Sequence, residues 1–304
     1  MRQVFIIAVL MLTCAVAHAE TIEEAGRAIV AKNQDAVVSV KLTVKESMAF
    51  EGHSSQKHDS TIEATGTCVD PSGLVVVSLR TIDRSEMMGA FSMGFGEEGF
   101  KSKYDSEIVD VKIVVGANTE IPAKVILRDK DLDLAFVRPI EKPAKPFAAI
   151  DLSRDSKPKL LEQVIIIDRM GKPENRQPVA LLSRVGSIIE KPRTFYIAAD
   201  LLTALTLGSP ALTVDGKVVG IMVYRIQPMG RREAADMMSM GRGGLTPGVL
   251  PAADVLDVAK QALAAPDGTK ELSSGRRDPA APGRKDTQTG AGEKKEEKKE
   301  EKKK

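Results

Sequence analysis

Residues 65–82 decide the fold and read TGTCVDPSGLVVVSLRTI. The run Val75-Val76-Val77 is apolar and β-branched, which is typical of a buried strand, and residues 62–68 have a similar character. Between them, Asp70-Pro71-Ser72-Gly73 carries the residue types that favour a β-turn. This stretch therefore predicts two strands, at residues 62–68 and 73–78, joined by a short turn.

Further strand signals run outward from this pair in two series. The first series also includes residues 36–44, 108–115, 121–127 and 134–138, and the second consists of residues 164–168, 179–189, 194–199 and the hairpin 211–224. A connector rich in Pro, Lys and Asp, residues 139–156, separates the two series. Many short strands at this spacing favour a β-barrel or a β-sandwich, and parallel α/β architecture is disfavoured because no long helices lie between them. The predicted fold class is all-β, with two units of similar size.

The first residues resemble an export signal. Arg2, the apolar run at residues 4–17 and the small-x-small site Ala17-His18-Ala19 predict a signal peptide over residues 1–19. Cys14 allows a lipoprotein as the alternative, which the threonine before it disfavours. We therefore expect an exported protein, periplasmic or secreted.

The remaining chain divides into a folded domain and a tail. We expect the domain at residues 20–265, with an amphipathic helix at 251–264 as its last element. Residues 266–304 are rich in Gly, Pro and charge, ending in Lys-Lys-Glu-Glu repeats, and predict a disordered tail. A long charged helix is the alternative, which like charges four residues apart disfavour.

Composition excludes some classes of partner. A net charge of +2 with 28% charged residues gives no indication of nucleic-acid binding. After the signal peptide no run of 18 apolar residues remains, so we expect no membrane span. Cys68 is then the remaining cysteine, which excludes an intramolecular disulfide and favours a buried thiol over a reactive one.

The order of these motifs resembles the trypsin-like serine proteases of the HtrA type. Residues 65–82 resemble the strand pair that leads to the catalytic histidine of that family, with Arg80 at the histidine position. Residues 121–137 resemble the segment in which the catalytic aspartate precedes a short apolar strand, and Asp133 matches that aspartate. The resemblance covers residues 36–263 and implies two antiparallel β-barrels, at about 36–140 and 158–250.

A third stretch, residues 205–221, resembles the nucleophile loop of the same family and the hairpin after it. This alignment places Leu207 at the serine position, and a gapless register would place Gly208 there instead. Neither residue has a hydroxyl. Leu205 stands where the family has a glycine of the oxyanion hole, and a leucine resists the backbone angles that a glycine accepts there.

The resemblance implies acyl transfer, which needs a hydroxyl nucleophile, a base and a carboxylate that orients the base. Leu207 has no nucleophilic atom, and Arg80 stays protonated at physiological pH. We therefore expect no intact catalytic site and predict that the chain is not an enzyme.

A rebuilt triad of Ser209, Asp133 and either His53 or His58 is the alternative site. Both histidines fall in the polar stretch 51–60, which we expect to be a surface loop away from the nucleophile loop, so this triad is disfavoured. The two histidines with a nearby aspartate also make an incomplete metal site, so we expect no metal and no cofactor.

The sequence also predicts an ion pair at the site and the character of two Met-rich stretches. Arg80 and Asp133 are expected to form a partly buried ion pair in the place of the histidine–aspartate contact. The Met-rich stretches 87–93 and 237–240 are interpreted as mobile loops, with an adaptable apolar binding surface as the alternative.

These interpretations favour an exported pseudoprotease that holds a peptide or a partner protein in its cleft. The family often carries a PDZ domain after the protease domain, and we expect none here because only a helix and a tail follow the last strands. The alternatives are an active HtrA-like serine endopeptidase and an envelope protein that binds polyanions through its charged tail.

Overall fold

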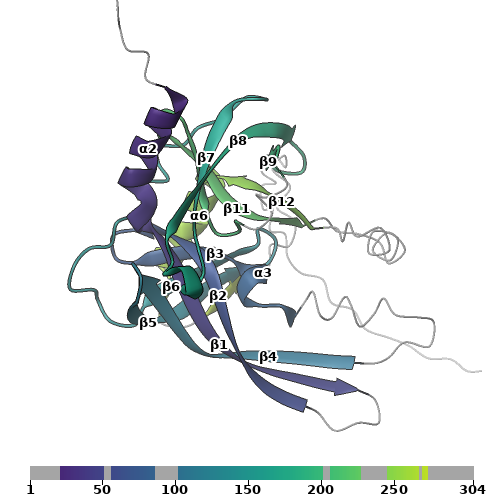
Figure 1. Ribbon diagram of the computed structural model, residues 1–304. Coiled ribbons are helices and arrows are strands. Elements are labelled where there is room, and N and C mark those ends of the chain that lie inside the picture. Colours follow the sequence, from purple (N-terminus) through teal and green to yellow (C-terminus); the bar gives the residue numbers. More distant parts are fainter. Residues whose placement is uncertain are drawn as a thin grey trace, which may run out of the picture. The chain divides into compact units, whose positions relative to one another are not determined.

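A computed structural model describes residues 21–50, 56–85, 102–200, 206–226, 245–266 and 269–272. Most of these residues belong to strands, which form two closed antiparallel β-barrels (Figure 1). The predicted fold class is confirmed.

The first barrel holds the two strands predicted at residues 62–68 and 73–78. Its strands are β1 (Val37–Phe50), β2 (Gln56–Asp70), β3 (Leu74–Ser78), β4 (Ser102–Val115), β5 (Thr119–Asp129) and β6 (Leu134–Pro139). The order around the barrel is β5-β4-β1-β2-β3-β6, and pairing of β6 with β5 closes it. A short parallel strand, β13 (Lys270–Leu272), is added to β5 and lies beyond residue 265, where the domain was expected to end.

Three strands of this barrel, β1, β2 and β4, extend well beyond their predicted ranges. β2 begins at Gln56 and β4 at Ser102, because both continue to pair with β1 as far as Met48 and Phe50 (Figure 1). His58 therefore lies exposed in a strand, and the prediction that it belongs to a surface loop is wrong. Hydrogen bonds to β1, which lies between β2 and β4, keep this polar segment extended although its composition does not favour a strand.

The second barrel consists of β7 (Gln163–Arg169), β8 (Pro178–Ile189), β9 (Phe195–Ala198), β10 (Pro210–Thr213), β11 (Val218–Ile226) and β12 (Leu245–Pro251), closed in the order β10-β11-β12-β9-β8-β7. Sequence reasoning missed β12 because it contains two prolines, which cannot donate to a ladder. In the structure Pro247 lies opposite Tyr224 and Pro251 opposite Gly220. Along β12, residues whose backbone groups bond to β11 alternate with residues whose backbone groups point away from it. Pro247 and Pro251 are of the second kind, so the ladder does not need the N–H groups that they lack.

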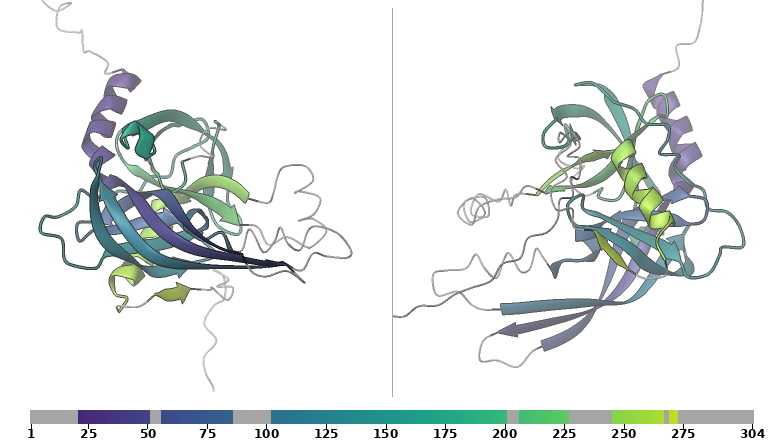
Figure 2. Two further views of the ribbon diagram at one scale, coloured as in Figure 1. Left: turned by 60° about the horizontal axis from the view of Figure 1, so that its bottom comes forward. Right: turned by 180° about the vertical axis from the view of Figure 1, so that it is seen from behind.

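The helices lie outside the barrels. α2 (Ile22–Asn33) begins with a capping box, in which Thr21 and Glu24 exchange side-chain-to-backbone hydrogen bonds. α3 (Leu79–Ile82) is a single turn directly after β3, and α6 (Ala252–Leu263) follows β12. Short 3-10 turns occupy Gln34–Ala36 and Lys172–Glu174. The predicted late helix is confirmed, and its buried face packs against strands of both barrels (Figure 2).

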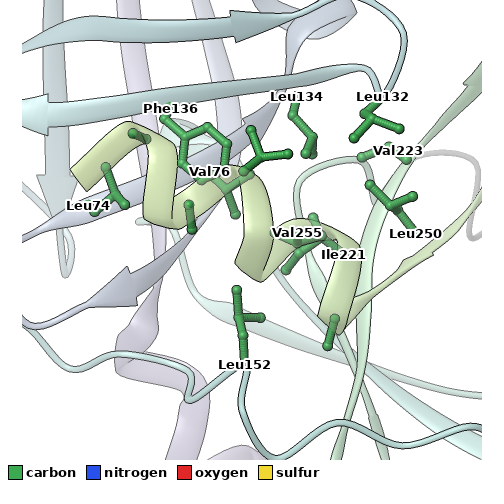
Figure 3. Close-up of a cluster of buried hydrophobic side chains, with 14 of the residues drawn as sticks. Leu74, Val76, Leu132, Leu134, Phe136, Leu152, Ile221, Val223, Leu250 and Val255 are labelled. Carbon is green, nitrogen blue, oxygen red and sulfur yellow. The ribbon is translucent and has the colours of Figure 1, made fainter. Parts of the chain in front are cut away.

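One apolar cluster joins the two barrels to α6 (Figure 3). Leu74 and Phe136 come from the first barrel, Ile221 and Leu250 from the second, and Val255 from the helix. All five side chains are fully buried. Because apolar burial is the main favourable contribution to folding, this shared cluster fixes the position of β11 relative to β3 and β6.

Polar contacts join the barrels at a second place. Arg176, next to β8, is buried and donates from Nε and Nη2 to the two carboxylate oxygens of Glu63 on β2, at 2.6 and 3.1 Å. The same guanidinium also donates to the backbone carbonyl of Ala117 in the first barrel. Thr65 on β2 donates to Asp168 on β7 at 2.6 Å. A paired guanidinium satisfies its donors in a buried setting, so these contacts limit relative movement of the barrels.

Candidate functional site

Asp133 lies where the two barrels meet and is fully buried. One carboxylate oxygen accepts the backbone N–H of Arg80 at 2.9 Å, and the other accepts the Ser78 hydroxyl at 2.6 Å and the backbone N–H of Tyr224 at 2.8 Å. Ser78 and Arg80 belong to the end of β3 and to α3, whereas Tyr224 belongs to β11. A single carboxylate therefore holds the second barrel's β11 against the first barrel.

The backbone of Asp133 supports this placement. Its φ angle is +57°, in the left-handed region that aspartate tolerates better than most residues, and its carbonyl accepts the N–H of Leu79 at 2.9 Å. The turn before β6 thus directs the side chain inward, toward the three donors.

Burial raises the pKa of Asp133 from its usual 3.8 to about 6. The hydrogen bonds from Ser78, Tyr224 and Arg80 act in the opposite direction, and the positive charge of Arg80 adds a smaller lowering effect. The balance of these effects decides how much negative charge the site carries near neutral pH.

The predicted ion pair between Arg80 and Asp133 is wrong. Arg80 reaches the carboxylate through its backbone N–H, and both oxygens are already occupied by short contacts to Ser78, Tyr224 and that N–H. The guanidinium acts on Asp133 only through the longer-range attraction that lowers its pKa. The prediction failed because backbone donors leave no trace in a sequence.

The loop before β10 carries Leu207, which is 8% exposed. Gly208 donates its N–H to the Met222 carbonyl at 2.7 Å, and its own carbonyl accepts the Thr67 hydroxyl of β2 at 2.7 Å. Since Met222 and Tyr224 belong to one strand, the loop and the Asp133 contacts lie next to each other along β11. The alignment that brings positions 80, 133 and 207 to one region is consistent with this geometry.

Ser209 follows in the same loop. Its side chain is fully buried, and its hydroxyl has no hydrogen-bond partner among the described residues. His58, one of the two candidate bases, faces solvent on β2. The structure therefore does not bring His58 into contact with Ser209 or Asp133.

Several predicted residues fall outside the part of the chain that the structure describes. These are His53, Leu205, the Met-rich stretches 87–93 and 237–240, the signal peptide and the charged residues of the tail. Within the described ranges, no group of three His, Cys, Asp or Glu side chains is arranged to hold a metal ion. None of the described helices has the length and apolar character needed to cross a membrane.

Sequence reasoning missed two members of this site, Ser78 and Tyr224. Ser78 stands two residues before Arg80 at the end of a buried strand, where a hydroxyl is a usable signal for a buried hydrogen bond. Tyr224 contributes a backbone N–H, which any residue type except proline would supply, so no sequence signal marks it.

The match to family models identifies the class of protein. Residues 64–221, just over half of the chain, match the model of the trypsin-like peptidase domain, and the chain belongs to this family. The predicted membership of the trypsin-like family is thereby confirmed.

Two solved structures are similar to this chain. One is the protease domain of MamO from Magnetospirillum magneticum in its apo form, with 14% identity, a TM-score of 0.46, and coverage of 75% of this chain and 97% of that chain. The other is the HtrA-type protease AlgWS227A with a tripeptide, with 11% identity, a TM-score of 0.49, and coverage of 78% of this chain and 62% of that one. No curated protein sequence matches the chain.

The prediction that the chain is not an enzyme is wrong. Residues 64–221 belong to a peptidase family, and that membership points to a protease. The prediction treated the side chains at positions 80 and 207 as decisive for the whole site. The site also contains the Asp133 carboxylate with its hydrogen-bond donors and the Ser209 hydroxyl.

Proposed function

We propose that the protein is an exported member of the trypsin-like peptidase family that binds an extended polypeptide segment along the edge of β11. The observation that carries this proposal is the edge of β11 beside the Asp133 contacts, with which no described strand pairs. Among the described residues, β10 pairs with β11 only from Val218 to Ile221, and no strand lies beside the rest of β11 on that side.

The alternation of β11 defines which backbone groups face this edge. The N–H and carbonyl of Met222 are directed to Ser209 and Gly208 on the β10 side, and the N–H of Tyr224 is directed to Asp133. Backbone groups alternate in direction along a strand. The carbonyl of Tyr224 and both backbone groups of Ile226 therefore point away from β12, on the same side as the N–H of Tyr224. They supply one donor and two acceptors to an added strand.

A strand added to an open sheet edge gains affinity from backbone hydrogen bonds, which are independent of sequence, and specificity from its side chains. The Asp133 contacts hold β11 in place beside this edge, which lowers the entropic cost of binding. This arrangement suits unfolded or extended segments of proteins.

Ile226→Pro tests the backbone contacts. The change removes an N–H that faces the open edge and that the β12 ladder does not use, so the barrel is expected to stay folded. We expect binding of a fluorescein-labelled ten-residue Thr/Val peptide, measured by fluorescence anisotropy, to weaken at least about tenfold.

Ile226→Ala is the matched control, since it shortens the same side chain and keeps the N–H, and it should change affinity less than about threefold. Equal loss in both variants, or unchanged binding in Ile226→Pro, would argue against edge binding.

The mass of the peptide is determined by mass spectrometry after each binding measurement. Hydrolysis of the bound segment is the second candidate function, which membership of a peptidase family favours, and a cleaved peptide would reveal it.

Export rests on residues 1–19, whose charge and apolar run are typical of a signal peptide. We expect the protein recovered from the exported fraction of its host to begin at Glu20. Its intact mass provides the measurement, and a full-length mass starting at Met1 would contradict export by this signal.

A further inference from the structure

We infer that Arg225 selects bound segments that carry an acidic side chain, so that the edge of β11 prefers Asp- or Glu-containing strands. This inference rests on the proposed function, because it assigns a preference to the same edge. It is carried by the position of Arg225 in β11, by its charge environment and by its partial burial.

The position of Arg225 places it against a bound strand. Its backbone lies opposite Thr246 of β12, and it stands between Tyr224 and Ile226, whose backbone groups face the open edge. A residue of an added antiparallel strand that lies directly opposite Arg225 forms a non-hydrogen-bonded pair with it on that side. Side chains are closest in such pairs, and opposite charges there attract.

The charge of Arg225 is not neutralised by the described part of the protein. Its guanidinium donates to the Lys191 backbone carbonyl at 3.4 Å and forms no ion pair with a described carboxylate. In the neighbouring segment Lys191 follows Glu190, and Arg193 is paired with Asp254 at 2.6 Å. The charges of that segment therefore offset one another, and the positive charge available to a bound strand is that of Arg225 itself.

Partial burial increases the effect of this charge. Arg225 is half-buried. Its side chain lies on the same face of β11 as that of Val223, which is fully buried in the apolar cluster. A half-buried charge is screened less by water and salt than an exposed one. The planar guanidinium also matches the two oxygens of a carboxylate, which a neutral amide in the ligand does not reproduce.

A peptide series tests the preference. Ten-residue Thr/Val peptides carry Glu, Gln or Lys at each interior position in turn, and their affinity is measured by fluorescence anisotropy at low and high salt. We expect one position at which Glu binds at least about tenfold more tightly than Gln and Lys binds most weakly. The Glu advantage should shrink at high salt.

Charge reversal identifies the residue responsible. Arg225→Glu is expected to invert the order at that position, so that Lys binds most tightly. Arg184→Glu is the matched control, because Arg184 is an exposed arginine of the same barrel that lies on β8, away from this edge. Circular dichroism melting checks that both variants are folded.

The outcomes separate this inference from the proposed function. If wild-type protein binds the Glu, Gln and Lys peptides equally, or if both charge reversals shift the preference alike, the role of Arg225 is overturned while edge binding stands. If no peptide of the series binds, the proposed function fails together with it. Inversion by Arg225→Glu alone supports both.

Discussion

Replacing Gly208 with alanine is expected to lower the free energy of unfolding by about 4 kcal/mol or more, or to prevent folding. The φ angle of Gly208 is +88°, and a Cβ atom there would lie 2.0 Å from the carbonyl oxygen of Thr65. This neighbour belongs to the backbone of β2 and cannot rotate away. The loop would have to leave β2, which also breaks the hydrogen bond from Thr67 to the Gly208 carbonyl.

Gly116→Ala is the control for this variant. Gly116 also has a positive φ, +61°, but a Cβ atom there would meet nothing within 4 Å. It should therefore show only the conformational cost of about 1–2 kcal/mol. Thermal unfolding followed by circular dichroism provides the measurement. If Gly208→Ala folds, we expect its melting temperature to lie about 10 °C below that of the wild type. Equal melting temperatures for the two variants would show that the loop is not pressed against β2.

The strands that sequence analysis predicted best are those whose side chains are buried on both faces. β3 is the clearest example, because all of its residues from Leu74 to Ser78 are buried and the sequence there is a nearly continuous apolar run. The hairpin predicted at residues 211–224 is also found, as β10 and β11, and the turn between them contains Gly216, whose φ of +74° a glycine accepts without strain.

Elements that depend on partners elsewhere in the chain were not predictable. The first residues of β2 and β4 are polar and become strands only because β1 runs between them. β12 carries Pro247 and Pro251, and its pairing becomes acceptable only once the register with β11 is known. In both cases tertiary context outweighs local preference.

The candidate site divides in the same way. The order of motifs predicts that Arg80, Asp133 and the Leu207 loop lie in one region of the fold, and in the structure Arg80 contacts Asp133 while the loop contacts β11. The chemistry within that region depends on backbone groups, namely the N–H groups of Arg80 and Tyr224 that bind Asp133. Backbone groups are common to nearly all residue types, so a sequence cannot tell which of them a carboxylate will meet.

Asp133 should make the protein less stable as the pH rises from 4 to 6. Burial raises its pKa to about 6, compared with the usual 3.8 expected in the unfolded chain. Between these values the folded state binds more protons than the unfolded state, so its stability falls with rising pH. With these two pKa values the folded state loses about 2 kcal/mol of stability between pH 4 and pH 7, because the unfolded carboxyl is already partly ionised at pH 4.

Asp133→Asn isolates this contribution, because asparagine has the same shape and does not ionise. Whichever way its amide is oriented, its NH2 group faces the N–H of either Arg80 or Tyr224, so one buried hydrogen bond is lost at every pH. We expect the variant to be less stable than wild type by about 2 kcal/mol more at pH 4 than at pH 7. Chemical denaturation at both pH values measures the difference, and contributions from other carboxylates cancel because both proteins share them. A larger deficit at pH 7 than at pH 4 would mean that the three hydrogen bonds outweigh burial and hold the pKa of Asp133 below its usual value.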